Sequence, residues 1–183
     1  MKKLFVIAAL VPMTIGTMMM TSCGASKPDV VEEVIPKGMV VVDLSKLGQP
    51  VRINLPDSIA GPLDSLETAT GIQLRVGNNF DMLVNAGGAE EGDLAKQKSL
   101  IEATDAGMST FTVNDATTLV WETRFGDLSM FHFYVVVKIG DAIYYVRDNN
   151  TNIDNAFKKE DVDRMLESAK SLRANPAAEA PAS

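Results

Sequence analysis

Residues 128–147 read LSMFHFYVVVKIGDAIYYVR, and this stretch decides the fold that the sequence predicts. Two runs rich in β-branched and aromatic residues flank Gly140-Asp141. A glycine at the first position of a two-residue loop is typical of a type II′ hairpin turn. That turn fixes the register, because Ile139 then faces Ala142 and the pairing continues residue by residue. The stretch therefore predicts a long antiparallel hairpin.

Strict alternation separates the side chains of this hairpin into two faces. One face is apolar and is expected to join the core: Phe131, Phe133, Val135, Val137, Ile139, Tyr144 and Val146. The other face is amphipathic: His132, Tyr134, Val136, Lys138, Ile143, Tyr145 and Arg147. Two interpretations of the second face stay open, because either a helix covers it or a ligand or partner binds it.

A second turn, at Gly126-Asp127, allows two registers between the hairpin and the strand before it. A two-residue loop sets Glu122 opposite Phe131, on the core face. A three-residue loop sets Glu122 opposite His132, on the amphipathic face. We expect the three-residue loop, because burying an unpaired carboxylate costs on the order of several kcal/mol and a changed turn costs much less.

The same patterns predict the remaining elements. Strands are expected over 39–44, 51–55, 71–76, 80–84, 109–113, 117–125, 128–139 and 142–147, and helices over 90–104 and 160–173. The closing helix has the clearest pattern, with one apolar stripe formed by Val162, Met165, Leu166, Ala169 and Leu172. We predict an α+β fold whose largely antiparallel sheet of about six to eight strands carries one mid-chain and one closing helix.

Composition excludes several classes of function. The 17 Lys and Arg against 24 Asp and Glu give a net charge of −7, which argues against a nucleic-acid partner. A single His and a single Cys exclude a multi-histidine zinc site and a disulfide framework, and make a His-based triad hard to build. Two polar segments, Asn85–Gly88 and Asp148–Asn155, lack the residues of phosphate and calcium loops. We therefore expect no metal, no cofactor and no enzyme activity.

The N-terminus carries a targeting signal. Two lysines precede an apolar run, Leu4 to Val11, in the order of a secretory signal peptide. The segment MTSC at 20–23 resembles a bacterial lipobox, and Cys23 is the only thiol in the chain. The resemblance implies that residues 1–22 are removed and that Cys23 carries palmitate-type acyl chains as a membrane anchor. An ordinary signal peptide, or an uncleaved anchor, with an incidental cysteine is the alternative.

The domain organisation follows from this signal. Residues 23–37 are expected as the acylated cysteine and a flexible tether, 38–173 as a single domain, and 174–183 as a disordered Ala/Pro-rich tail. A lipoprotein of this kind is expected in the envelope of a Gram-negative bacterium, on the outer membrane facing the periplasm.

The element order, together with Ile53-Asn54-Leu55-Pro56 at the end of a strand, resembles the PsbP-like and DcrB-like α/β/α sandwiches of several small lipoproteins. The resemblance covers about residues 50–172 of the chain. It implies a non-catalytic role, because members of that family mostly bind or scaffold other proteins. It carries over no catalytic residue.

The amphipathic hairpin face supplies the candidate binding residues, which are His132, Tyr134, Lys138, Tyr145 and Arg147. Aromatic rings stack on sugars, and an arginine fork binds carboxylates. His132 beside Glu122 is a candidate acid–base pair, and a strand histidine without such a role is the alternative.

Two serines are candidate modification sites. Ser58 and Ser65 each follow an aspartate and precede an apolar residue. This pattern resembles the O-glycosylation sites that some Gram-negative bacteria use in exported proteins. Both serines fall in a predicted loop between two strands, where a glycan would fit.

Taken together, these features predict a non-catalytic envelope lipoprotein. We expect it to bind a protein partner, or to act as an accessory or assembly factor at the membrane. A carbohydrate- or peptide-binding accessory module on a lipid anchor is the alternative.

Overall fold

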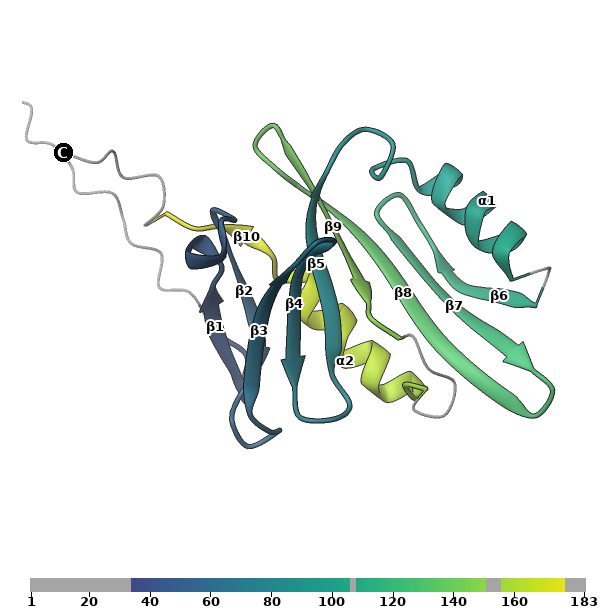
Figure 1. Ribbon diagram of the computed structural model, residues 1–183, viewed down its shortest axis with the longest axis horizontal. Helices are drawn as coiled ribbons and strands as arrows, with labels where there is room; N and C mark the ends of the chain where they lie inside the picture. Colours follow the sequence, from purple (N-terminus) through teal and green to yellow (C-terminus); the bar gives the residue numbers. More distant parts are fainter. Residues whose placement is uncertain (1–33, 106–107, 151–155, 177–183) are drawn as a thin grey trace, which may run out of the picture. The chain divides into compact units, whose positions relative to one another are not determined.

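The computed structural model describes residues 34–105, 108–150 and 156–176, which Figure 1 shows in colour. These residues form two α-helices, one short 3₁₀ helix and ten strands in two antiparallel sheets. The prediction of an α+β fold with a largely antiparallel sheet is therefore confirmed. The predicted signal peptide, Cys23 and residues 151–155 lie outside the described residues.

The larger sheet has seven strands in the order β3 (Leu63–Thr68), β4 (Gly71–Val76), β5 (Asp81–Gly87), β9 (Ala142–Asp148), β8 (Leu128–Ile139), β7 (Thr118–Phe125) and β6 (Ser109–Asn114). The predicted hairpin register is confirmed, since Ile139 lies opposite Ala142 and Val137 lies opposite Tyr144. Gly140 has a φ of 59°, which a tight turn requires and which glycine adopts without strain. Because β9 also pairs with β5, the hairpin joins the two halves of the sheet.

The smaller sheet has the order β1 (Met39–Asp43), β2 (Val51–Pro56) and β10 (Arg173–Ala174), with the 3₁₀ helix η1 (Ser45–Leu47) between β1 and β2. The strand β10 was not expected, because the closing helix was predicted to reach residue 173 and the tail to begin at 174. Instead, Ala174 pairs with Val51, and Asn175 is 5% exposed. Backbone hydrogen bonds to β2 hold residues 173–174, so these residues need no hydrophobic pattern from which the strand could be predicted.

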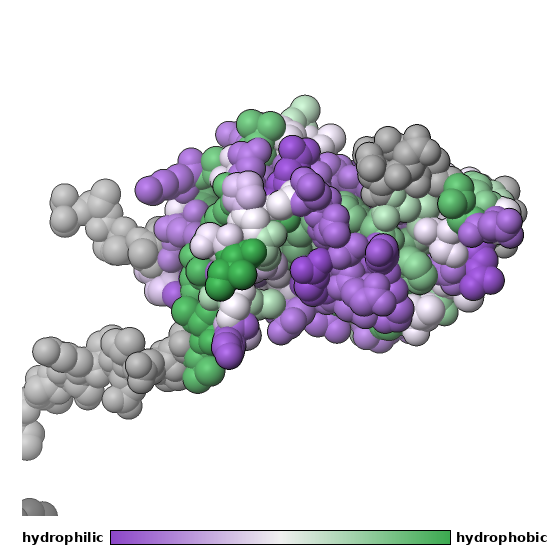
Figure 2. Space-filling model, turned by 90° about the horizontal axis from the view of Figure 1, so that it is seen from below, coloured by the Kyte–Doolittle hydropathy of each residue, from purple (hydrophilic) through white to green (hydrophobic). Residues whose placement is uncertain are grey.

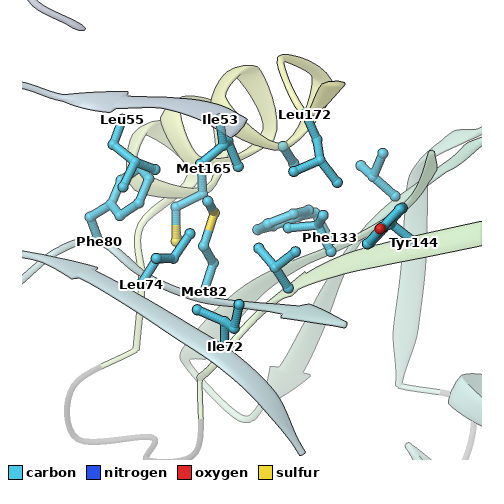
Figure 3. Packing of buried hydrophobic residues seen from close by; sticks show 14 of the residues in the cluster. Ile53, Leu55, Ile72, Leu74, Phe80, Met82, Phe133, Tyr144, Met165 and Leu172 are labelled. Atoms are coloured by element: carbon cyan, nitrogen blue, oxygen red, sulfur yellow. The ribbon is translucent and has the colours of Figure 1, made fainter. Parts of the chain in front are cut away.

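The closing helix α2 (Lys159–Lys170) packs against both sheets, and the three together form the main core (Figure 3). Its predicted stripe is confirmed, because Val162, Met165 and Ala169 have no exposed surface. In Figure 3, Met165 lies between side chains of the smaller sheet, such as Ile53, and side chains of the larger sheet. Each such buried side chain contributes roughly 1.5–3 kcal/mol, so α2 joins both sheets into one folded unit.

The mid-chain helix α1 (Leu94–Thr104) lies beside β6 and β7 on the opposite side of the larger sheet from α2 (Figure 1). It starts at Leu94 rather than at residue 90, because the Asp93 carboxylate accepts a hydrogen bond from the Lys96 backbone N–H and caps the helix. We call the two sides of the larger sheet the α2 side, which includes Phe133, and the α1 side, which includes Arg147.

The register of β7 corrects one prediction. Glu122 lies opposite Phe131, so the loop at Gly126-Asp127 has two residues and the expected three-residue loop is wrong. The argument against this register assumed an unpaired carboxylate. In the structure the Glu122 carboxylate accepts hydrogen bonds from Arg124 Nε at 2.8 Å and from Ser129 Oγ at 2.6 Å. These bonds remove the penalty that was expected for this position.

The strand β3 corrects a second prediction, because its residues were expected in a loop. Its charged and hydroxyl residues, such as Asp64 and Ser65, are exposed. An edge strand pairs on one side only and needs no apolar face, so polar residues are tolerated there. Ser65 therefore lies in a strand, whereas Ser58 lies in an exposed loop as predicted.

Candidate functional site

Exposed apolar side chains do not by themselves mark a docking surface on the side shown in Figure 2. On that side, hydrophobic residues form separate groups with hydrophilic residues between them. Large continuous apolar patches are the usual sign of an interface. The polar and aromatic residues of the α1 side, where the sequence predicts the candidate binding residues, are therefore the better indication of a site.

The helix α1 covers only part of the α1 side. Its cluster contains Leu94, Leu119 and Tyr134, with Trp121 and Tyr145 packed at its border. The helix packs chiefly against β7, and the β9 residue Tyr145 lies at the border of its cluster, whereas no residue of β4 or β5 belongs to that cluster. Both interpretations of the amphipathic face therefore apply, each to a different part of it.

Tyr134 and Tyr145 belong to the covered part. Tyr134 is 6% exposed and its hydroxyl donates a hydrogen bond to the Glu91 carbonyl at 2.9 Å. Burial raises the pKa of the Tyr134 hydroxyl well above its ordinary value, so the hydroxyl stays protonated. The two rings stack at 5.5 Å with an interplanar angle of 6°. Gly87 leaves room for the Tyr145 ring, because a Cβ at residue 87 would lie 2.8 Å from a ring carbon.

The uncovered part is formed by residues of four neighbouring strands. We call it the open strip and define it as Gln73, Leu83, Arg147 and His132. Leu83 lies opposite both Gln73 and Arg147 in the ladder, and opposite residues share a face. Trp121 borders the strip, because it lies opposite His132.

His132 is held rigidly at one end of the open strip. Its Nδ1 lies 2.9 Å from Asp148 Oδ2, and its ring stacks on Trp121 at 5.1 Å. Asp148 is 5% exposed, and its other oxygen accepts a hydrogen bond from the Phe133 N–H at 2.9 Å. A carboxylate can only accept, so Nδ1 carries the proton of this bond. The expected partner, Glu122, is instead bonded to Arg124 and Ser129.

Arg147 is half-buried and lies where the open strip meets the covered part, because Leu83 is opposite it on β5 and Tyr134 is opposite it on β8. Among the described residues no carboxylate forms an ion pair with it. Asp81, on the neighbouring strand, already accepts hydrogen bonds from Gln73 at 2.9 Å and from Asn149 at 3.3 Å. Lys138, the other predicted cation of this face, is exposed and lies toward the opposite end of β8, where it pairs with Ile143. The structure therefore does not bring the two cations together.

The first of the two polar segments is engaged by the protein itself, and residues 151–155 of the second lie outside the described residues. The Gly88 N–H donates to the Glu91 carboxylate at 2.9 Å, which lowers the pKa of Glu91 and occupies the position that an external anion would need. Within the described ranges no group of three or more His, Cys, Asp or Glu residues could hold a metal ion. Neither described α-helix has the length and apolarity that a bilayer crossing requires.

Sequence reasoning missed three residues of this region: Gln73, Leu83 and Asp148. The positions of Gln73 and Leu83 depend on the pairing of β5 with β4 and β9, which has no local signature. Asp148 directly follows the predicted hairpin strand, but alternation along the strand does not predict its side-chain contact with His132. The position of Trp121 could have been predicted from the sequence, because a two-residue loop at Gly126-Asp127 places this residue opposite His132. No protein-family model matches the chain, and no curated protein sequence matches it.

Proposed function

We propose that this protein is a non-catalytic envelope lipoprotein, anchored through Cys23 and facing the periplasm from the outer membrane, that binds a protein partner through the open strip. The observation that carries the proposal is the uncovered part of the α1 side, where a half-buried Arg147 lies near a stacked Trp121–His132 pair. Arginine is enriched among the residues that dominate protein interfaces.

Two further observations support this role. The lipobox-like segment at 20–23 contains Cys23, the only thiol of the chain, at the position where a lipoprotein carries its acyl chains. The order α1, sheet, α2 agrees with the layers that a relationship to the PsbP-like and DcrB-like sandwiches implies, and members of that family mostly bind or scaffold proteins.

A carbohydrate-binding role is less well supported, because it needs aromatic rings with a free face. Tyr134 is buried and Tyr145 stacks against it. Trp121 stacks on His132 and contacts the cluster beneath α1. We therefore place a protein partner ahead of a sugar.

Site-specific photo-crosslinking in the native envelope tests the proposed surface. A crosslinking amino acid at Gln73 should give an adduct of defined mass, because Gln73 belongs to the open strip. The same amino acid at Glu167, which is exposed on α2, is the matched control and should give none. Equal adducts at both positions, or none at Gln73, would contradict the proposal.

Metabolic palmitate labelling tests the anchor independently. Wild-type protein should incorporate the label and fractionate with membranes, and Cys23→Ala should lose both properties, because no other thiol can accept the lipid. Label that persists in Cys23→Ala would show that the chain is not anchored at this position.

A further inference from the structure

We propose that Arg147 is the anchor of a carboxylate-binding subsite, which receives an acidic side chain from an extended segment of the partner protein. This inference rests on the proposed function and adds the chemistry of the partner. It follows from the pairing of the charged residues, the residues beside Arg147 and the dimensions of the strip.

The pairing of arginines sets Arg147 apart. Arg75, Arg124 and Arg164 each form an ion pair with a nearby carboxylate. Arg147 forms neither an ion pair nor a hydrogen bond with any residue that the structure describes, although the chain has an excess of acidic residues. The Arg147 residue is half-buried, and none of its nitrogens is among the buried, unpaired polar atoms, so the guanidinium is accessible to an external carboxylate, which it can bind through a bidentate fork.

Arg147 lies beside an apolar residue of the sheet. Leu83 is 4% exposed and lies opposite both Gln73 and Arg147 in the ladder, so the three side chains share the α1 side. Gln73 is itself fixed, because its Nε2 lies 2.9 Å from both oxygens of Asp81. Leu83 and the fixed Gln73 therefore lie beside Arg147 in the strip.

The charges around Arg147 favour a ligand with one negative charge. Asp81 lies on the neighbouring strand and Asp148 follows Arg147 directly, and both are acidic. Arg75 is committed to Asp81 at 3.4 Å. A dianionic phosphate would be repelled by the two aspartates, whereas a carboxylate matches a single arginine fork.

The strip has apolar borders at both ends. Leu66 lies opposite Gln73 and is 57% exposed, and Trp121 lies at the other end. Five strand spacings of about 4.8 Å separate Leu66 from Trp121, which is the length of about seven extended residues. The subsite thus fits an acidic residue with an apolar residue on each side.

A peptide titration tests the subsite. The probe is the acetylated, amidated peptide Leu-Ser-Ser-Ser-Glu-Ser-Leu, whose leucines stand at its two ends with the longer spacing on the Leu66 side of Arg147, with its Gln analogue as the neutral control. Binding to the purified full chain is followed through the fluorescence of Trp121, the only tryptophan. Arg147→Gln should weaken binding of the Glu peptide at least about tenfold. Lys138→Gln, which removes an exposed cation from the same side, should leave binding unchanged.

Each outcome decides the proposal. Glu-peptide binding that depends on Arg147 and is lost in the Gln analogue supports it. Equal binding of both peptides, binding unchanged by Arg147→Gln at an unchanged thermal midpoint, no peptide binding, or preferential binding of inorganic phosphate or of phosphatidylglycerol vesicles overturns it. A crosslink from Gln73 that persists in Arg147→Gln would contradict the subsite and leave the proposed function standing. Arg147-dependent binding of the Glu peptide without any envelope crosslink would support the subsite and contradict the proposed function.

Discussion

The two sides of the seven-stranded sheet differ in how completely other elements cover them. On the α2 side, residues such as Phe133 and Val146 are fully buried against α2 and the smaller sheet. On the α1 side, α1 covers the region around Tyr134 and leaves the open strip around Arg147 without a described helix. The comparison indicates that the α2 side mainly stabilises the fold, and that the α1 side leaves polar side chains accessible on a stable sheet.

The largest expected effect comes from breaking the α2 side. Met165→Asp should unfold the protein, because it places an unpaired charge at a fully buried position and removes core packing, at a cost on the order of 4–5 kcal/mol. The total stability of a domain is about 5–15 kcal/mol, so this loss removes most of it. Thermal unfolding followed by circular dichroism is the measurement. Glu167→Asp, on the exposed face of the same helix, should leave the midpoint within a few degrees.

An intermediate effect is expected at Gly71, on the α1 side. A Cβ there would lie 1.6 Å from Asn85 Oδ1, and φ is +126°, so Gly71→Ala must displace a buried side chain. We expect a loss of about 2–4 kcal/mol in a urea titration. Gly48→Ala separates the two causes, because φ is +79° there and no atom lies within 4 Å. It should cost only about 1–2 kcal/mol, and equal losses would refute the packing argument.

The smallest effect concerns the polar border of the α2 side and depends on pH. Hydrogen bonds from Arg124 and then Ser129 lower the pKa of Glu122 below its ordinary value. Its stabilisation is therefore fully present above the unfolded pKa of about 4.3 and is lost as the pH falls through the folded pKa. Glu122→Gln should destabilise the protein at pH 7, and its difference from wild type should shrink as the pH falls below about 4. A difference that stays constant from pH 7 to pH 3 would contradict the charge-based account.

The sequence predicted those features that local patterns encode. Alternation and the turn at Gly140 determined the β8–β9 register, and the spacing of Val162, Met165 and Ala169 determined the buried face of α2. Glu122 was misplaced because side-chain partners two and seven residues away satisfied a charge that was counted as unpaired. The balance of such bonds against burial is a property of the fold and not of the local pattern.

The candidate site was predicted in part for the same reason. His132, Tyr145 and Arg147 follow from alternation along one hairpin, and the structure places all three on the α1 side. Whether each is covered or open depends on where α1 begins, which is four residues later than expected because Asp93 caps the helix. The pairing of His132 with Asp148 instead of Glu122 depends on the register of β7.

Hydroxyl-radical footprinting of the protein in its native envelope, compared with the purified protein, tests most directly whether the open strip is a binding surface. Leu66, beside Gln73, and Leu128, at the tip of the β7–β8 hairpin, are 57% and 55% exposed, so both should be oxidised at similar rates in the purified protein. In the envelope, a bound partner should protect Leu66 severalfold and leave Leu128 unchanged. Unchanged oxidation of Leu66, or equal protection of both leucines, would contradict the account.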